Sequence, residues 1–540
     1  MHKPKIQQKT ERRISAGLRL ALVAVLLLAQ IVLVVLLSIV LRQRMAVAYT
    51  VLELLAIAVA VRIYMKPGRT TSYKLGWILL VLAVPVAGLI LYFLWNGDRQ
   101  QKRLDLKKKP SLDENEAVRG RSAASLEKLR RRYPQWGKLA DYLCMQDFLL
   151  YQHTRVTYLP TGEAYLEDLL DKAEHAERFI FLEYYIMAEG QIWDRLTDIF
   201  RRKAAAGVEI KVIFDDFGSI MRMPPEQVDR LRQMGVQVIV FNPVHHYVNR
   251  LYFNYRDHRK IACVDGTVSY TGGANIADEY ANLIRRFGYW KDCGVRLEGE
   301  GAWGLTKMFL ELWAQLGGSF EEETDYYRPQ LHVDGAGFCQ PLCDGPDNNP
   351  VNTAEDTFLH LITSANESVY ITTPYLAIDE AMMRALCLAA DSGVDVRLMM
   401  PGIPDHKFAY LVAQCYFGEL LECGVKIYTF EPGLLHGKSA LSDRQTGFVG
   451  SVNMDYRSFQ LHFECGAVFY DMPETAAALL AVMDYRRFQL HFESGAVFYD
   501  MPETAAAPLD AMETIMARSR YLTREDRPTR PLPPTLIRPV

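Results

Sequence analysis

The stretches HRKIACVD (258–265) and HGKSALSD (436–443) repeat one pattern, H-x-K-x-x-x-x-D, within a chain of 540 residues. The polar trio recurs at the same spacing, while the residues between its members differ. Each copy continues with a glycine seven residues after the aspartate and an asparagine three residues later, at Gly272 and Asn275 and at Gly450 and Asn453. One motif match carries a false-positive risk, but two copies with one continuation indicate a site built from two related halves.

The residues before each copy follow the same order of expected elements. Before the first copy, an apolar strand at 179–187 leads to an amphipathic helix ending at Gly207, and further strands begin at 207 and 235. Before the second copy, the same order starts at 368, with helices ending at Gly393 and Gly424. Alternating strands and helices predict a mixed α/β sheet covered by helices. We therefore expect fold class α/β, with two pseudo-repeated domains at 150–330 and 331–525 that share one active site.

Composition excludes several classes of protein. The net charge of −3 argues against a nucleic-acid partner. The nine cysteines are scattered without a C-x-x-C pair, which argues against a structural zinc site and a disulfide framework. Cys263 lies inside the first motif on an expected strand, so we interpret it as a core residue.

Apolar content is concentrated at the N-terminus, which predicts a membrane region at 1–96. Segments 20–41 and 75–95 are long enough to cross a bilayer, whereas 45–64 is shorter and carries Glu53, so two or three spans are open. Segment 20–41 is too long for a secretory signal and has no small-residue cleavage site. Basic residues flank every segment, so the orientation is also open. A charged linker and juxtamembrane helix are expected at 97–149, and a tail at 526–540.

The motif residues suit transfer of a phosphoryl group. Lys260, Lys438, Asn275 and Asn453 would surround an anionic tetrahedral group and stabilise charge on its oxygens. Of His258 and His436, one can attack phosphorus while the other protonates the leaving oxygen and then serves as a base. Because the lysines supply positive charge, we expect neither a metal nor another cofactor.

Each histidine needs an acceptor for its far nitrogen. We assign Asp292 to His258 and Glu464 to His436, because each acid lies on the strand after the asparagine. Asp265 and Asp443 complete the motifs as candidate catalytic residues, but each ends a strand before a turn, which favours support of the fold. Aromatic residues nearby are interpreted as packing or lipid-contact residues: Trp290 and Tyr375.

A tandem duplication interrupts the second half. Residues 454–482 and 483–511 are identical at 24 of 29 positions. Only the first copy follows Asn453, and it reads FECG where the second reads FESG. We therefore expect Glu464 to hold the sheet position, with the second copy as an insertion. The alternatives are that Glu493 replaces Glu464, or that the insertion impairs folding.

Together these motifs resemble the phospholipase D superfamily and, within it, bacterial cardiolipin synthases. The resemblance covers about 46–525 and rests on FLEYYIMAEGQIWD, NYRDHRKIACVDG, YTGGANIADEY, RRFGYWKDCGVRLEG, ITTPYL, LHGKSALSD and VGSVNMDYRSFQLHFECG. It implies phosphatidyl transfer between two phosphatidylglycerol molecules at the bacterial inner membrane by a multi-pass protein. By analogy with the superfamily, His258 is the nucleophile and His436 the general acid and then base.

Three other functions share parts of this pattern. A phospholipase D-like hydrolase or another phosphatidyltransferase would use the same covalent step with water or a different alcohol. A nuclease of the superfamily is disfavoured, because the chain shows no basic aromatic groove. An inactive membrane scaffold would usually show decay in one motif, and both motifs are intact.

Overall fold

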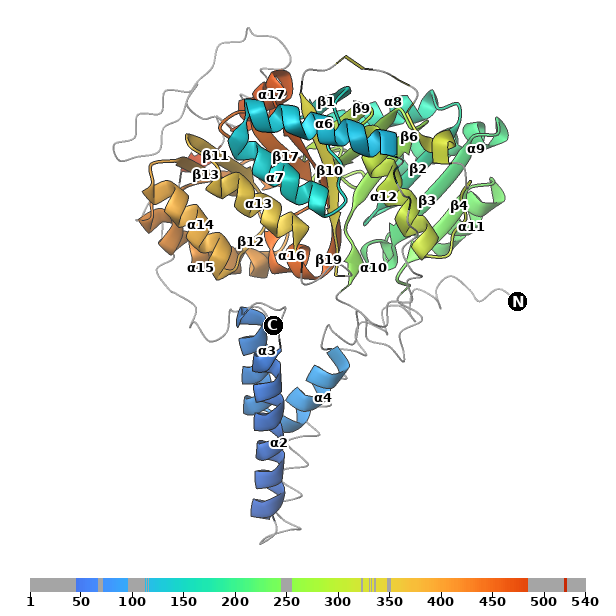
Figure 1. Ribbon diagram of the computed structural model, residues 1–540. Helices are drawn as coiled ribbons and strands as arrows, with labels where there is room; N and C mark the ends of the chain where they lie inside the picture. Colours follow the sequence, from blue (N-terminus) through green and yellow to red (C-terminus); the bar gives the residue numbers. More distant parts are fainter. Residues whose placement is uncertain are drawn as a thin grey trace, which may run out of the picture. The chain divides into compact units, whose positions relative to one another are not determined.

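The computed structural model describes residues 45–66, 71–95, 112, 114, 116–243, 255–321, 324–329, 331, 333–334, 337–346, 351–483 and 519–521. The chain divides into two compact units, Met1–Arg103 with Pro533–Val540, and Leu104–Leu532. We call the second one the large unit. Figure 1 shows the elements of both units. The expected span at 20–41, the linker at 97–111, most of the second duplicate and the tail at 526–540 lie outside the described residues.

The described part of the first unit contains three apolar helices, α2 (Met45–Met65), α3 (Thr71–Ala83) and α4 (Pro85–Trp95). The sequence predicts one span at 75–95, but the helix is interrupted at Val84, directly before Pro85. Proline lacks the backbone N–H and clashes with the preceding turn, so it begins a new helix. Within the described residues, no helix combines the length and apolar character that a membrane crossing requires.

The large unit contains two sheets with the same strand order. The first runs β1-β9-β7-β6-β2-β3-β4 and the second β10-β19-β17-β16-β11-β13-β14, with β20 added at its edge. In each sheet three neighbouring strands are parallel and the others antiparallel. The first sheet comprises β1 (Thr154–Leu159), β2 (Phe179–Tyr184), β3 (Glu209–Asp215), β4 (Gln237–Phe241), β6 (Lys260–Val264), β7 (Val268–Gly272) and β9 (Gly294–Gly299). The second comprises β10 (Phe338–Asp344), β11 (Ser368–Thr372), β13 (Asp395–Pro401), β14 (Lys426–Phe430), β16 (Ser439–Ser442), β17 (Thr446–Gly450), β19 (His462–Tyr470) and β20 (Ser519–Tyr521).

Helices follow the strands in the predicted order, and the predicted α/β organisation is confirmed. Helix ends coincide with the expected glycines, since Gly207, Gly235, Gly393 and Gly424 have φ of 87–93°, the left-handed conformation that glycine tolerates best. The helices of the two halves are α8 (Gly162–Glu174), α9 (Gln191–Ala205), α10 (Asp216–Ser219), α11 (Pro225–Gln233), α12 (Ala302–Gln315), α13 (Thr353–Thr363), α14 (Glu380–Asp391), α15 (Lys407–Glu422), α16 (Tyr456–Gln460) and α17 (Pro473–Met483), with a 3-10 turn at Thr324–Tyr327.

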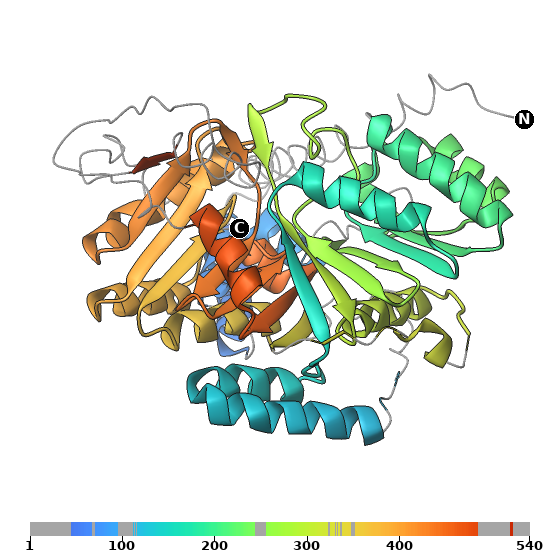
Figure 2. The same ribbon diagram turned by 90° about the horizontal axis from the view of Figure 1, so that it is seen from above.

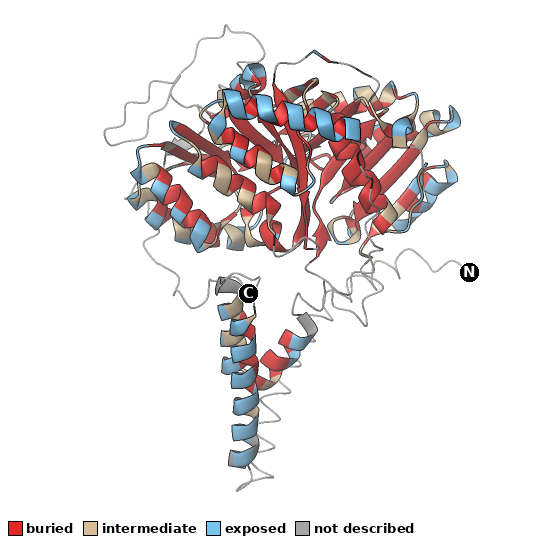
Figure 3. Ribbon diagram, in the orientation of Figure 1, coloured by how far each residue is buried: buried red, intermediate tan, exposed pale blue. Residues whose placement is uncertain are grey.

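The two sheets pack against each other through a central core. Alternate residues of β19 divide between this core and the helical layer, because side chains on a strand point to opposite faces in turn. Cys465 and Phe469 lie in the central cluster, while Val468 and Tyr470 lie in the cluster beneath α13 and α14. Figure 3 shows that most strand residues are buried and that the outer faces of the helices are exposed.

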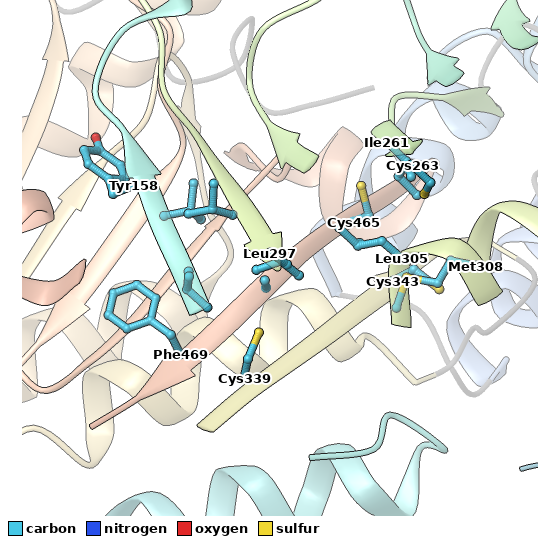
Figure 4. Packing of buried hydrophobic residues seen from close by; sticks show 14 of the residues in the cluster. Tyr158, Ile261, Cys263, Leu297, Leu305, Met308, Cys339, Cys343, Cys465 and Phe469 are labelled. Carbon is cyan, nitrogen blue, oxygen red and sulfur yellow. The ribbon is translucent and has the colours of Figure 1, made fainter. Parts of the chain in front are cut away.

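Figure 4 shows residues of both halves meeting in the central core. Leu297 of β9 and Phe469 of β19 belong to the same cluster. Cys263 is fully buried in it, which confirms the interpretation of this cysteine as a core residue. No described cysteine forms a disulfide.

Two helices before the first sheet pack against the large unit, α6 (Glu116–Arg132) and α7 (Pro134–Met145), and Figure 2 shows them side by side. Charge in this region predicts a solvated juxtamembrane helix, but one face of α6 is buried, including Leu126 and Leu129. Tyr133 donates a hydrogen bond to Asp471 at 2.7 Å. These helices therefore belong to the packed body of the large unit.

Short strands join the two halves. β5 (Arg256–Asp257) of the first half pairs in parallel with the start of β19, and β15 (Gly433–Leu435) of the second half pairs in parallel with β8 (Tyr289–Lys291). Within the second half, β12 (Leu376–Ala377) pairs in parallel with β18 (Met454–Asp455). The chain thus crosses between halves directly before each motif histidine.

Candidate active site

Each motif histidine is fixed by the strand exchange between halves. The backbone N–H of His258 donates to Phe463 O at 2.9 Å, and that of His436 donates to Lys291 O at 2.7 Å. Both side chains are buried, with residue exposures of 8% and 6%. Each of the two motif histidines is therefore held by a strand of the opposite half that carries an acidic residue or directly precedes one.

The histidine–carboxylate pairs are crossed. His258 Nδ1 lies 2.9 and 3.0 Å from the two carboxylate oxygens of Glu464, and His436 Nδ1 lies 2.7 Å from Asp292 Oδ2. The sequence-based assignment of Asp292 to His258 and Glu464 to His436 is therefore wrong. The physical reason is the exchange: β5 runs beside β19, which carries Glu464, and β15 runs beside β8, which leads to Asp292.

Both carboxylates are fully buried and hydrogen-bonded. Glu464 accepts from the Ser458 hydroxyl at 2.8 Å and from the Ser451 hydroxyl. Asp292 accepts from the backbone N–H of Cys293 at 2.9 Å and from Trp290 Nε1 at 3.4 Å. These donors orient each carboxylate toward its histidine. Glu464 of the first duplicate occupies the sheet position, as the sequence predicts.

The histidines are favoured in their neutral form. Burial is the main cause that lowers the pKa of His258 well below 6.5, and Lys260, Lys438 and His436 lower it further. Burial and Lys438 also lower the pKa of His436, although Asp292 opposes them. Burial alone would raise the pKa of Asp292, but His436 and Lys438 lower it to about 2. A neutral imidazole beside an ionised carboxylate is the state that a nucleophile or general base requires.

The motif lysines lie against the histidines. Lys260 Nζ donates to the backbone oxygen of His258 at 2.5 Å, and Lys438 Nζ lies 2.8 and 3.1 Å from the two ring nitrogens of His436. Burial is the main cause that lowers the pKa of both ammonium groups, to about 7 for Lys260. An anionic phosphoryl group entering the site would stabilise the charged form of both lysines.

The two asparagines differ. Asn275 Oδ1 accepts from Ile186 N at 3.0 Å, and its Nδ2 donates to the Tyr280 hydroxyl at 2.7 Å. Asn453 Oδ1 is buried and has no hydrogen-bond partner among the described residues. The side chain of Asn275 is thus fixed by hydrogen bonds on both its oxygen and its nitrogen, whereas the side-chain oxygen of Asn453 has no donor among the described residues.

The motif aspartates lie at the opposite ends of their strands from the histidines. Asp265 accepts hydrogen bonds from three consecutive backbone N–H groups at the start of β2, at 2.7–2.9 Å. Asp443 does the same before β11, at 2.8–3.1 Å. Both have positive φ, 54° and 49°. Both aspartates therefore fasten the start of a neighbouring strand through hydrogen bonds, the supporting position that the sequence favours for them.

Rings that sequence reasoning did not assign to the site pack against the two histidines. Trp290 lies 5.2 Å from His436, and His462 lies 5.3 Å from His258, measured between ring centroids. Each precedes an orienting acid by two residues, a spacing visible in YWKD and LHFE. Trp290 packs as the sequence predicts. His462 was missed because it lies outside the two H-x-K-x-x-x-x-D motifs, which were the signal that identified His258 and His436.

One group of residues has the composition of a metal site. His258, His462 and Glu464 place potential ligand atoms within 4.8 Å of one another. Lys260 lies beside this group, since the charge of Glu464 acts on its ammonium, and its positive charge opposes a divalent cation there. The same three residues include the histidine and acid already paired for catalysis.

Two α/β halves with carboxylate-held histidines and flanking lysines in one buried site define an enzyme of the phospholipase D superfamily. A family model described as "Cardiolipin synthase, PLD-like domain" matches residues 166–285 and 358–487, and one described as "Phospholipase_D-nuclease N-terminal" matches 54–96. The chain is 34% identical to a cardiolipin synthase of Geobacillus sp. (strain WCH70) over 75% of this chain and 81% of that protein. It belongs to the cardiolipin synthase family.

Other relatives agree. Cardiolipin synthase 2 of Bacillus anthracis is 34% identical over 75% of this chain and 78% of that protein. An uncharacterized protein of Streptococcus mutans is 38% identical over 73% and 85%. The crystal structure of a phosphatidylserine synthase from Haemophilus influenzae matches with a TM-score of 0.51 at 14% identity, covering 71% of this chain and 92% of that one, which supports the fold.

Proposed function

We propose that the protein makes cardiolipin by transferring a phosphatidyl group from one phosphatidylglycerol to the glycerol hydroxyl of another. The observation that carries this proposal is the crossed pair of buried histidines, each held through Nδ1 by a carboxylate and flanked by a lysine. With Nδ1 engaged, Nε2 of His258 is left for the substrate, and Nε2 of His436 lies 3.1 Å from Lys438 Nζ.

In the first step, His258 Nε2 attacks phosphorus and the bond from phosphorus to the glycerol oxygen breaks. The anionic phosphodiester raises the pKa of His436 when it enters the site, and the protonated His436 gives its proton to that oxygen as glycerol leaves. In this proposal Lys260 and Lys438 stabilise the negative charge on the phosphoryl oxygens, and the side-chain amide of Asn453 donates a hydrogen bond to them. A phosphatidyl-His258 intermediate results.

In the second step, the glycerol hydroxyl of another phosphatidylglycerol attacks phosphorus. Neutral His436 accepts the hydroxyl proton, and the bond between phosphorus and His258 breaks. Cardiolipin and the free enzyme result, with both histidines in their starting states. No metal takes part, since the lysines supply the positive charge.

We also propose that the protein is inserted in the bacterial inner membrane through more than one segment. Residues 20–41 carry no charge over 22 positions and form the anchor in this proposal. α2 and α3 expose apolar side chains, with Val47, Leu54 and Leu79 60–66% exposed. Resistance to extraction from membranes by alkaline carbonate, lost on deletion of 1–96, tests the anchor.

Mass spectrometry of lipids after incubation of the purified protein with phosphatidylglycerol alone tests the reaction. Cardiolipin with an equal amount of glycerol is expected, and neither should form with the His258→Ala variant. Phosphatidic acid in place of cardiolipin would identify a hydrolase and overturn the proposal. Use of an alcohol other than phosphatidylglycerol as the preferred acceptor would identify another phosphatidyltransferase.

A further inference from the structure

Exposed apolar side chains gather on three segments that follow strands of the large unit. We call them the rim: Phe217, Met221, Leu283, Ile284, Ile403, Phe408 and Leu411, which are 41–67% exposed. Two follow β3, two lie between β7 and β8, and three follow β13. Figure 1 shows α10 and α15, which belong to the first and third segments, along the same edge of the large unit as α16.

The two rim segments of the first half lie beside the catalytic histidines. After β3, the Ser219 hydroxyl donates to the backbone oxygen of Tyr185, and the Tyr185 ring packs 5.1 Å from His258. Before β8, Asn282 holds Trp290 through two hydrogen bonds of 2.7 and 2.9 Å to its backbone. The Trp290 ring in turn packs against the other catalytic histidine.

The rim segment of the second half also reaches the site. Asp405, between Ile403 and Phe408, accepts a hydrogen bond from the Tyr375 hydroxyl at 2.5 Å. Burial is the main cause that lowers the pKa of His436 and Lys438, and the negative charge of Asp405 partly opposes it, so this loop lies within electrostatic reach of both. The rim therefore surrounds the site from both halves.

Cations are interspersed with the apolar side chains. Arg285 and Arg286 directly follow Ile284, and Lys407 directly precedes Phe408, and all three are exposed. Arg457 is exposed as well, and its charge lowers the pKa of His258. Exposed apolar groups beside arginine and lysine are the composition that binds an anionic lipid surface. The chain as a whole is slightly acidic, so bulk charge does not explain these cations.

We propose that the rim docks on an anionic phospholipid surface and brings the mouth of the active site to the lipid head groups. This inference rests on the proposed function, since a phosphatidyl donor and a phosphatidyl acceptor both have to reach the site from a bilayer. The apolar side chains enter the interface, and the cations contact lipid phosphates. The rim thereby acts on access of lipid to the site and takes no part in the chemical steps.

Full-length protein in phosphatidylcholine liposomes tests this with two substrates. One is long-chain phosphatidylglycerol within the bilayer, and the other is dihexanoyl phosphatidylglycerol dissolved as monomers. The variant Ile284→Asp, Phe408→Asp should lower cardiolipin formation from the bilayer substrate at least tenfold. Its rate with the dissolved substrate should stay within twofold of the unaltered protein.

Leu388→Asp is the matched control, because Leu388 is 61% exposed on α14 and Phe408 is 67% exposed on α15. This control should leave both rates unchanged. Equal loss with both substrates in the rim variant, or no loss with either, would overturn the docking inference. Failure of the unaltered protein to form cardiolipin from either substrate would instead overturn the proposed function.

Discussion

The two halves of the active site share a scaffold but not their surroundings. Each histidine follows an exchanged strand and binds a buried carboxylate of the other half. Around His436, Trp290 covers the ring and donates to Asp292. Around His258 the equivalent position holds His462, whose Nδ1 lies 3.6 Å from Glu464 Oε1 and whose ring nitrogens make no hydrogen bond within the described part of the chain. A symmetric framework thus carries two chemically different positions, as a nucleophile and an acid–base residue require.

The largest effect should come from separating the roles of the two histidines. A phosphatidyl donor whose leaving group is p-nitrophenol needs no general acid, because nitrophenolate leaves without a proton. His436→Ala should release about one nitrophenol per active site and then stop, while His258→Ala should release none. Both variants should lower cardiolipin formation about 10³-fold or more. A burst from His258→Ala and none from His436→Ala would exchange the roles.

The crossed pairing predicts which acid serves which step. Glu464→Gln should slow the nitrophenol burst, whereas Asp292→Asn should leave the burst and slow later turnover, each by about 10²-fold. The reason is that each carboxylate fixes one imidazole and stabilises its charged form. Glu493→Gln is the control from the second duplicate and should have no effect. Loss of activity in that variant would show that the second copy supplies the acid.

The lysines should differ in how they set the pH dependence. Burial lowers the pKa of Lys260 to about 7, so its positive fraction in the free enzyme falls as pH rises through that value. We expect kcat/KM to fall about tenfold for each pH unit above it, since this ratio reports groups of the free enzyme. Lys260→Arg keeps a permanent charge and should move the fall to higher pH. An unchanged profile in this variant would assign the fall to Lys438 or another group.

The smallest effect should be on stability, at the position where the halves differ. A buried polar group without a hydrogen bond lowers the free energy of unfolding by about 1–3 kcal/mol. His462→Phe should therefore raise that free energy by about 1 kcal/mol, whereas Trp290→Phe should lower it slightly through loss of the bond to Asp292. Chemical denaturation followed by circular dichroism measures both. If His462 contacts the lipid substrate, His462→Phe also loses activity. A gain in both stability and activity would exclude that role.

Most of the fold follows from local sequence. The glycine-terminated helices and the buried strands that follow them could be located because helix ends and apolar runs depend on near neighbours. The repeated H-x-K-x-x-x-x-D also placed both histidines and lysines in one site. Pro85 signals the interruption of the helix at Val84, but the prediction missed it. The span at 75–95 was predicted from its hydropathy alone, without regard to the effect of proline on the backbone.

The partners of the histidines could not be predicted in the same way. Asp292 and Glu464 were recognised as orienting acids, but each was assigned to the histidine of its own half. The exchange of β5 and β15 decides the pairing, and it depends on contacts between residues 206 and 144 positions apart, for which the sequence has no local signal. His462 was not predicted either, because no motif surrounds it and its contact with His258 also joins residues far apart in the sequence.

The exchanged strands also have a consequence during synthesis. His258 contacts a carboxylate 206 residues further along the chain. At about 5–20 residues per second, roughly 10–40 s separate the appearance of the nucleophile from that of its partner. Nascent chains therefore carry an unsupported imidazole while 206 of the 540 residues are added, and the site is complete only when the second half has been made. A ribosome that stalls before residue 464 leaves an inert product, so the enzyme cannot act on lipid while it is still incomplete.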